Sequence, residues 1–245
     1  MSNDTRSPAV NSLGQPIGAE LPAWTPPLLP SREPIQGRYC RLEPIDERFA
    51  ADLHAANSED ADGRTWTYLP YGPFSNETEY HRWLVATCLG TDPLFHVVVN
   101  LATNRAMGVA AYLRITPASG AIEVGHIHFS PLLQRSRVAT EAMYLMMKRV
   151  FALGYRRYEW KCDAALSASR AAAQRLGFSY EGIFRQATVY RNRNRDTAWY
   201  AVIDEEWPAL AQAFEKWLDP SNFDDRGCQR LRLSALTRPL LAKHG

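Results

Sequence analysis

Apolar and polar side chains alternate along the first regular part of this chain. Residues 38–45 (RYCRLEPI) alternate in this way, which predicts a strand, and Asp46 stands where it can cap a helix through about residue 56. Further strands are predicted at 94–100, 106–115 and 121–129, separated by turn residues. After Gln134 the apolar positions follow a helical period instead, and they predict a helix that runs to about residue 153 and stops at Gly154.

The second half of the chain continues this pattern. It predicts a strand at 155–162, a short helix at 167–176 and a hairpin of two strands, 178–185 and 196–203, around the turn RNRNRD. A last helix is expected at about 205–218. Because a helix between two strands forms a crossover, some neighbouring strands should be parallel. An aromatic, turn-rich segment at 65–74 (TWTYLPYGPF) precedes a helix that opens at Ser75 and Thr78.

Proline divides the chain into three regions. Seven of the sixteen prolines fall in residues 1–37, which predicts an irregular N-terminal arm. Its apolar residues Leu21, Trp24, Leu28 and Leu29 indicate that part of the arm lies against the domain, with binding of a partner as the alternative. Residues 38–218 form the regular domain. Residues 219–245 are basic with scattered leucines, and they predict a loosely attached helix.

Charge and cysteine content narrow the function classes. The formal net charge is +2, from 28 basic and 26 acidic residues, so the balance does not indicate a nucleic-acid or membrane partner. Nucleic-acid binding stays a minor alternative because of RNRNRD and the basic tail. The four cysteines lie far apart without a Cys-x-x-Cys motif, which favours reduced thiols in a cytoplasmic protein. No apolar run is long enough to predict a membrane span.

The start of the long predicted helix carries a candidate binding site. The segment FSPLLQRSRVATEAM (129–143) places a Gln-Arg-Ser-Arg run directly before the helical pattern. The first backbone amides of a helix have no partner within the helix, and the helix dipole adds partial positive charge there. The segment therefore predicts a site for an anion, most commonly a phosphate.

The order of these elements resembles the GNAT superfamily of acyl-CoA-dependent N-acyltransferases. The resemblance rests on the 121–163 core and on QRLGF at 174–178, and it covers about residues 37–218. GRYCRLEPI, AIEVGHIHFSPLLQRSRVATEAM and AAQRLGFSYEGIFRQ look most like the RimJ/RimL-type branch. The resemblance implies an α+β GNAT fold: a central twisted mixed sheet of about seven strands, flanked by helices, whose fourth and fifth strands splay apart.

The resemblance also implies which residues bind the cofactor. The family's pyrophosphate loop reads Gln/Arg-x-x-Gly-x-Gly/Ala, and residues 134–139 occupy those places. Acetyl-CoA is the implied co-substrate, without a metal. Arg137 stands at the first glycine, where it fits if its φ is negative, and its guanidinium can bind phosphate. The expected cofactor-binding residues are His128, Phe129, Gln134, Arg135, Ser136, Arg137, Val138, Ala139 and Thr140.

The strand at 121–129 carries the candidate bases. Simple alternation would place Glu123, Gly125, Ile127 and Phe129 on one face and Val124, His126 and His128 on the other. Glu123 is the first candidate for the general base, with a purely structural ion pair as its alternative. His126 is the reserve base, and His128 is expected to flank the pantetheine. A metal site would need further ligands, and none stands at usable spacing.

Ser169 is the candidate proton donor to the leaving thiolate, although a serine at a helix start can equally be a cap. The asparagine that the family often has three residues earlier is Leu166 here. The amine acceptor is expected to contact Trp66, Tyr68 and Tyr71, unless these aromatic residues only form a minor core. Asp60 and Asp62 can attract a cationic amine, although Asp-Gly at 62–63 is also typical of a simple turn.

These observations predict an N-acetyltransferase. It would transfer an acetyl or acyl group from acetyl-CoA to a primary amine of a small molecule or a protein N-terminus, by direct attack in a ternary complex. The alternative is a catalytically silent CoA-binding or interaction module, suggested by the missing glycine and asparagine. The edge strands of the last hairpin also allow a homodimer.

Overall fold

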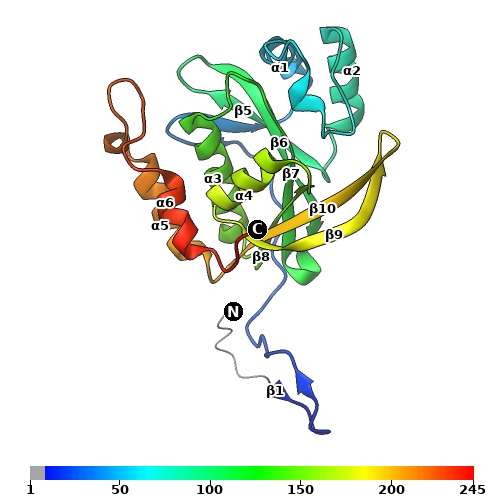
Figure 1. Ribbon diagram of the computed structural model, residues 1–245, viewed down its shortest axis with the longest axis vertical. Coiled ribbons are helices and arrows are strands. Elements are labelled where there is room, and N and C mark those ends of the chain that lie inside the picture. Colours follow the sequence, from blue (N-terminus) through cyan, green and yellow to red (C-terminus); the bar gives the residue numbers. More distant parts are fainter. Residues whose placement is uncertain (1–8) are drawn as a thin grey trace.

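Eight strands form the mixed sheet at the centre of the computed structural model, which describes residues 9–245. Figure 1 shows this sheet with helices on both faces. Its order is β3-β4-β5-β6-β7-β8-β10-β9, and only β7 and β8 pair in parallel. The strands are β3 (Ile35–Gln36), β4 (Cys40–Pro44), β5 (Leu94–Asn100), β6 (Arg105–Thr116), β7 (Ala121–Phe129), β8 (Arg157–Asp163), β9 (Ser179–Tyr190) and β10 (Arg193–Ile203). The mixed sheet predicted above is confirmed, with the two-residue β3 as an additional strand.

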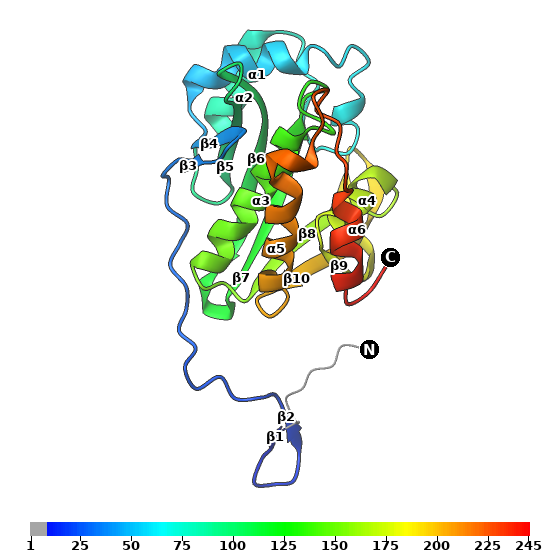
Figure 2. The same cartoon turned by 90° about the vertical axis from the view of Figure 1, so that its left-hand side faces the viewer.

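The helices form two layers. They are α1 (Ala50–Asn57), α2 (Glu77–Thr87), α3 (Arg137–Ala152), α4 (Ser167–Arg175), α5 (Trp207–Leu218) and α6 (Leu233–Thr237). The larger core packs α3, α4 and α5 on one face of the sheet, and the smaller core packs α1 and α2 on the other (Figures 1 and 2). No helix within residues 9–245 has the length and apolar content needed to cross a membrane.

Local capping explains where two of these helices begin. Asp46 caps the short 3₁₀ turn before α1 by accepting from the Arg48 amide, as predicted. The α2 helix was expected to open at Ser75, but Asn76 is its cap and accepts from the Glu79 amide. The Glu79 carboxylate in turn accepts from the Ser75 amide at 3.1 Å. Two backbone donors are thereby satisfied reciprocally, so the start of α2 lies one residue later than predicted.

The hairpin of β9 and β10 is longer than predicted. RNRNRD was expected to form the whole turn, but Arg193 already pairs with Tyr190, so the turn consists of Arg191 and Asn192. Both turn residues have positive φ, 48° and 57°, as a two-residue turn of a twisted hairpin requires. The strand β9 lies at the sheet edge. A homodimer through this edge stays a prediction.

Only part of the N-terminal arm lies against the domain. Residues 1–8, with one of the arm's prolines, lie outside the described residues. A small hairpin of β1 (Ala9–Val10) and β2 (Pro16–Ile17) extends from the body of the molecule (Figure 2). Trp24 contacts the loop before β7, and Pro27 is buried. Leu21, Leu28 and Leu29 are exposed, so the expected contact of part of the arm with the domain is made by Trp24 and Pro27 instead of by these leucines.

The C-terminal tail is anchored more firmly than predicted. Leu233 in α6 is fully buried in the larger core. The Thr237 hydroxyl donates to the Arg175 carbonyl at 3.0 Å, and the Tyr180 amide donates to the Lys243 carbonyl at 3.0 Å. The tail therefore belongs to the layer of α4 and α5, with Leu233 in the larger core and the partly buried Leu236 and Leu240 packed against it.

A buried carboxylate joins α3 to the start of β4. Glu141 in the first half of α3 accepts hydrogen bonds from three consecutive backbone amides, those of Arg38, Tyr39 and Cys40, at 2.8, 2.6 and 2.8 Å. A side chain at Gly37 would stand 2.6 Å from this carboxylate, so the position requires glycine for close approach. Glu141 thus supplies an acceptor for three backbone amides, of which the Cys40 amide is buried.

We expect Glu141→Ala to lower the free energy of unfolding by about 2–4 kcal/mol, because three backbone amides, one buried and two partly buried, lose their acceptor. Urea unfolding followed by circular dichroism measures the change. Glu59→Ala is the matched control: Glu59 is exposed in the segment after α1 and should change the free energy of unfolding by less than about 0.5 kcal/mol. Equal effects of the two substitutions would contradict the anchoring role of Glu141.

Candidate active site

The parallel pairing of β7 and β8 is short. It consists of four residue pairs, from Ala121 with Arg157 to Val124 with Trp160. Beyond Trp160, β8 remains paired with β10 as far as Asp163, while β7 remains paired with β6 as far as Phe129. The two strands therefore diverge after Val124, as the predicted splay requires. Backbone groups on the facing edges of the strands beyond this point are free to meet a ligand.

The alternation of side chains along β7 is interrupted at His126. Its φ is +48°, and the register with β6 shifts between Val109 and Ala111. This β-bulge moves the following residues to the other face. The predicted face assignment is therefore wrong beyond Gly125. The larger core receives Ile122, Val124, Ile127 and Phe129, whereas Glu123, His126 and His128 lie together on the face of α1 and α2.

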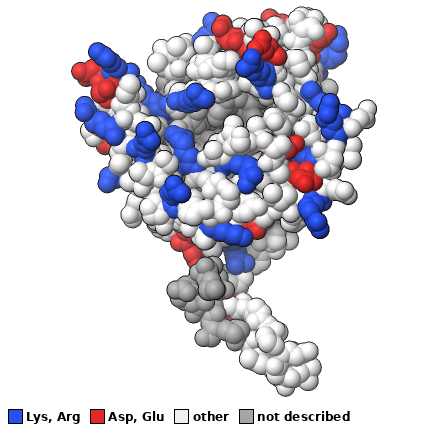
Figure 3. All heavy atoms as spheres, in the orientation of Figure 1, with Lys and Arg blue, Asp and Glu red and all other residues white. Residues whose placement is uncertain are grey.

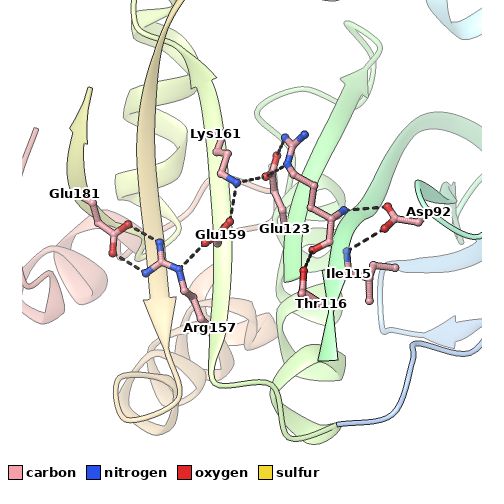
Figure 4. Close-up of polar contacts among 9 residues, drawn as sticks. Asp92, Ile115, Thr116, Glu123, Arg157, Glu159, Lys161 and Glu181 are labelled. Carbon is pink, nitrogen blue, oxygen red and sulfur yellow. Dashed lines mark hydrogen bonds and ion pairs between the residues drawn. The ribbon is translucent and has the colours of Figure 1, made fainter. Parts of the chain in front are cut away.

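Glu123 is held between two cations. Its side chain is only 3% exposed, and it receives a bidentate ion pair from Arg114 at 2.7 and 2.6 Å. Lys161 binds the same carboxylate at 2.8 Å and Glu159 at 2.7 Å (Figure 4). Both of its oxygens are therefore engaged by these two cations.

The ion pairs continue across the sheet. Arg157 binds Glu159 at 2.6 Å and Glu181 on β9 at 2.7 and 2.5 Å, so charged groups connect strands β6 to β9 on one face (Figure 4). Burial acts to raise the pKa of Glu159, but Arg157 and Lys161 outweigh it and lower that pKa. Lys161 also lies 3.7 Å from the ring centre of Trp199. These ion pairs connect β7 and β8 in the region where the two strands are still paired, before they diverge.

His126 is placed beside the gap. Its Nδ1 lies 3.0 Å from the Tyr71 hydroxyl, and the two rings stack at 5.7 Å. Burial, with a smaller contribution from Arg114, lowers the pKa of His126, so the imidazole is neutral at physiological pH. Within residues 9–245 no group is hydrogen-bonded to its Nε2. A neutral imidazole with one fixed and one free nitrogen is suited to accept a proton.

His128 is buried more deeply. It stacks on Trp66 with ring centres 3.6 Å apart, and its Nε2 lies 2.9 Å from the Thr65 hydroxyl. That hydroxyl donates to Asp60 at 2.7 Å. Burial lowers the pKa of His128 to about 4, with Asp60 acting in the opposite direction. The ring is therefore a neutral part of the wall, and its partners are those of the aromatic segment.

The three aromatic residues expected to contact the acceptor separate into two groups. Trp66 and Tyr71 pack on the histidines of β7, next to the gap. Tyr68 instead interacts electrostatically with Tyr190 on the hairpin. The pKa of Tyr190 is raised mainly by burial and then by Asp163, and Tyr68 makes a smaller contribution in the same direction. The minor core predicted as the alternative also exists, because Trp66 and Tyr71 pack with Phe74 and Trp83 in the smaller core.

The loop before α3 has the shape of an anion site. Gln134 donates to the Phe129 carbonyl at 2.8 Å, which ties the loop to the end of β7. Arg135 has a φ of +58°, and Ser136 caps the helix by accepting from the Ala139 amide at 3.0 Å. Among the described residues, no group accepts from the amides of 135–138. These amides lie at the mouth of α3, where they can bind an anion.

Arg137 does not need a glycine's freedom. It is the first residue of α3 and has a helical backbone. Its guanidinium lies 4.7 Å from the ring centre of Tyr39 and 5.3 Å from that of Phe223. The close approach in this region is made by Gly108 instead, where a side chain would stand 2.8 Å from Leu133 and 2.9 Å from the His128 carbonyl. The position that needs a glycine is therefore on β6, where the backbone lies close to Leu133 and His128. The first residue of α3 can then be an arginine.

Val138, Ala139 and Thr140 complete the first turn of α3, with Ala139 and Thr140 buried against the larger core. The Thr140 hydroxyl accepts from Arg175 at 3.1 Å. Arg175, in the last turn of α4, therefore brings a second cation beside the helix mouth. The sequence analysis missed it, since QRLGF gives no sign that its arginine turns toward α3.

Ser169 is not the cap of α4. It is the third residue of that helix, and its hydroxyl accepts from the Trp160 indole at 3.0 Å. Leu166 holds the cap position without a side-chain hydrogen bond. Because Trp160 makes the last parallel pair with β7, Ser169 lies at the point where the strands begin to diverge. The capping alternative for Ser169 is therefore wrong.

The hairpin of β9 and β10 reaches the aromatic segment. The Arg191 guanidinium donates to the carbonyls of Tyr71 and Gly72 at 3.0 and 2.6 Å. The Tyr190 hydroxyl donates to Asp163 at the end of β8 at 2.9 Å. The hairpin therefore contacts both the end of β8 and the aromatic segment, whose Tyr71 in turn contacts His126. Sequence reasoning did not find this bridging role of Arg191, the first arginine of RNRNRD.

Comparison with solved structures identifies close relatives. A GCN5-related N-acetyltransferase from Brucella melitensis is 45% identical, covers 89% of this chain and 99% of its own, and has a TM-score of 0.86. A probable GNAT-family acetyltransferase from Chromobacterium violaceum is 41% identical over 83% of this chain and 100% of its own, with a TM-score of 0.74.

A more distant structure shares the fold alone. RimL, a ribosomal L7/L12 alpha-N-protein acetyltransferase in complex with coenzyme A, is 20% identical over 70% of this chain and 98% of its own, with a TM-score of 0.57. A search of curated proteins finds no significant match. The RimJ/RimL branch therefore stays a prediction.

A family model supports the same assignment. The model described as an acetyltransferase (GNAT) domain matches residues 40–179, which contain the diverging strands, the α3 loop and Ser169. This range and the relatives that are more than 40% identical agree with the geometry of the gap. The chain belongs to the GNAT family of acyl-CoA-dependent N-acetyltransferases.

Proposed function

We propose that the enzyme transfers an acetyl group from acetyl-CoA to a primary amine, by direct attack of the amine in a ternary complex. The observation that carries this proposal is the early end of the β7–β8 pairing beside the mouth of α3. The gap where the β7–β8 pairing ends can take the thioester, and the mouth of α3 can take the pyrophosphate. The acceptor is a small-molecule amine or a protein N-terminus.

The residues at the helix mouth suit the cofactor. Acetyl-CoA supplies an acyl group activated as a thioester. The unpartnered amides of 135–138 would bind its pyrophosphate, and Arg137 and Arg175 would add positive charge on two sides of the loop. Figure 3 shows basic side chains across the middle of this face of the molecule.

The gap supplies what the transfer needs. Free backbone amides along the diverging strands would stabilise negative charge on the carbonyl oxygen. His126 would remove a proton from the amine, directly or through a water, because it is neutral and partly exposed. Glu123 would then act as a positioning residue, since Arg114 and Lys161 occupy its oxygens. Ser169 would donate a proton toward the leaving thiolate.

Purified protein incubated with acetyl-CoA and a library of primary amines is expected to release coenzyme A, measured as free thiol. Mass spectrometry then identifies the acetylated amine. Calorimetry with coenzyme A is run beside it. Binding without thiol release from any amine or peptide would support the alternative, a catalytically silent CoA-binding module, and would contradict the proposed transfer.

Arg137→Glu is expected to weaken coenzyme A binding roughly 10- to 100-fold, because a charge-assisted bond to phosphate is replaced by repulsion. Calorimetry measures the dissociation constant. The matched control is Lys148→Glu, which makes the same charge change on an exposed position of α3, about 16 Å along the helix. If both variants bind coenzyme A like the wild type, the loop does not bind the pyrophosphate.

His126→Asn is expected to lower kcat by about 10²- to 10⁴-fold, because the proton acceptor is lost. Only the neutral imidazole accepts a proton, so wild-type activity should fall as the pH drops through the pKa of His126. Burial lowers that pKa, which places the acid limb below the ordinary value of 6.5. A pH profile of kcat/KM measures this limb.

The surface substitution His81→Asn is the control and should leave both the rate and the profile unchanged, since His81 is exposed on α2. Glu123→Gln should reduce the rate while keeping the acid limb in place. An unchanged acid limb in His126→Asn, together with loss of the limb in Glu123→Gln, would assign the base to Glu123 instead.

A further inference from the structure

The tip of the N-terminal arm is a small hairpin that does not pack on its own domain. Its strands β1 and β2 have two residues each and pair with one another. Within residues 9–245, the hydrogen bonds of residues 9–17 all join two residues of this arm hairpin. Figure 2 shows it extended away from the body of the molecule. Because an isolated two-stranded hairpin is only marginally stable in water, we expect a binding partner to complete this one.

Asn11 fixes the turn of the arm hairpin. Its side-chain oxygen accepts from the amides of Leu13 and Gln15 at 2.9 and 3.0 Å, and its side-chain nitrogen donates to the Gln15 side chain at 2.9 Å. Leu13 is thereby presented at the tip and is 79% exposed, while Val10 and Ile17 are 61% and 45% exposed. A preformed turn loses little further conformational entropy on binding. The arm hairpin is therefore suited to insert an apolar tip into a groove.

Prolines hold the arm hairpin at a distance from its own domain. Pro27 and Pro30 are buried, and Pro27 lies beside Gly154 at the end of α3, so they anchor the root of the arm. Five prolines fall within residues 18–34, and each fixes its φ and lacks a backbone donor. A proline-rich segment of this kind is extended and stiff. The hairpin is thus directed outward, toward a neighbouring molecule.

A groove of about 380 Å³ lies at the root of the same arm. The arm contributes Ser31, Glu33 and Ile35 to its wall, and α3 with the residue after it contributes Leu145, Ala152 and Leu153. The Arg149 guanidinium joins the two walls by donating to the Glu33 carbonyl at 2.8 Å. Ala152 is exposed, and Ile35 and Leu153 are partly exposed, so the apolar part of the groove can be reached from solvent.

Charge complementarity favours an arm of this chain as the occupant. Residues 9–30 carry one charged side chain, that of the exposed Glu20. The groove has Lys148 and Arg149 at its rim, and Glu33 is the acidic side chain in its wall, where it accepts from the Ser31 hydroxyl at 3.4 Å. An apolar tip followed by one acidic residue matches an apolar groove with a basic rim.

Symmetry also favours a second copy of the chain. The root of the arm forms one wall of the groove, so a two-fold axis beside residues 31–35 would bring each arm hairpin to the groove of the other copy. The chain between Leu13 and Ser31 can span several tens of ångströms when it is extended. Such an arrangement uses the same surfaces on both copies and closes as a dimer.

We propose that two copies of this chain exchange their N-terminal arms. The tip of the arm hairpin around Leu13 lies in the groove between Ile35 and α3 of the other copy, and Glu20 lies beside its basic rim. This surface differs from the β9 edge, where a homodimer was predicted above. The exchange does not rest on the proposed acetyl transfer.

Sedimentation velocity of the full chain over about 1–100 μM tests the exchange, and the share of dimer should rise with concentration. Leu13→Asp should weaken the dimer at least about tenfold, because a charged tip does not enter an apolar groove. Val189→Asp is the matched control: Val189 is 73% exposed on the β9 edge, and its substitution should leave the dimer unchanged. A monomer at every concentration would overturn the proposal and leave the arm hairpin to a different protein. Loss of the dimer in Val189→Asp but not in Leu13→Asp would overturn it in favour of the β9 edge.

A substitution on the other side of the contact locates the groove. Ala152→Glu places a charge in the apolar part of the groove and should also weaken the dimer at least about tenfold, whereas Ala55→Glu on an exposed position of α1 should not. A mixture of Leu13→Asp and Ala152→Glu retains one intact arm and one intact groove, so it should contain more dimer than either variant alone. A mixture without this gain would overturn the proposal.

Calorimetry with coenzyme A separates this proposal from the proposed function. The groove lies at the opposite end of α3 from the loop proposed to bind the pyrophosphate, so Leu13→Asp and Ala152→Glu should bind coenzyme A like the wild type. Arm exchange without coenzyme A binding would contradict the proposed function alone. Coenzyme A binding by a chain that stays monomeric would overturn the arm exchange alone.

Discussion

The site depends on the point at which β7 and β8 stop pairing. Two parallel strands that remained paired to their ends would leave no free backbone groups between them. Here the pairing is limited to four residue pairs, because the bulge at His126 redirects β7 while β10 retains β8. The two strands thus diverge because β7 follows its partner β6 and β8 follows its partner β10. The gap, the position of Ser169 and the orientation of both histidines all follow from it.

A second constraint keeps the narrow end of the gap closed. Glu123, Lys161 and Glu159 are buried charges that partner one another across β7 and β8, and Arg114 completes the set from β6. Removal of one member would leave an uncompensated charge, which is far more costly than the pair itself is stabilising. The position of Glu123 on β7 is that expected of a catalytic base, but its ion pairs explain it equally well as a residue that holds β7 and β8 together.

The loop before α3, which we propose as the cofactor loop, shows how a fold accommodates a missing glycine. The position of Arg137 is helical, so it has no steric need for glycine, while the left-handed conformation is taken by Arg135. The tight contact that would need glycine occurs at Gly108, on the neighbouring strand. The family is shown by relatives more than 40% identical, whereas the loop itself departs from the family pattern in one residue without loss of its amide geometry.

Local sequence patterns determined the order of strands and helices. The periods of apolar residues, the caps at Asp46 and Ser136 and the glycine after α3 each act within a few residues. The predicted order was therefore correct, with small errors at the ends of the elements. The resemblance of a short loop then indicated the cofactor. Only the tertiary structure decided which groups meet. One residue in a bulge reversed the face of β7, and Arg114, Arg175 and Arg191 reach partners at least nine residues away. Such contacts depend on strand register and packing, which no local pattern encodes, and for that reason the surroundings of Glu123 could not be foreseen.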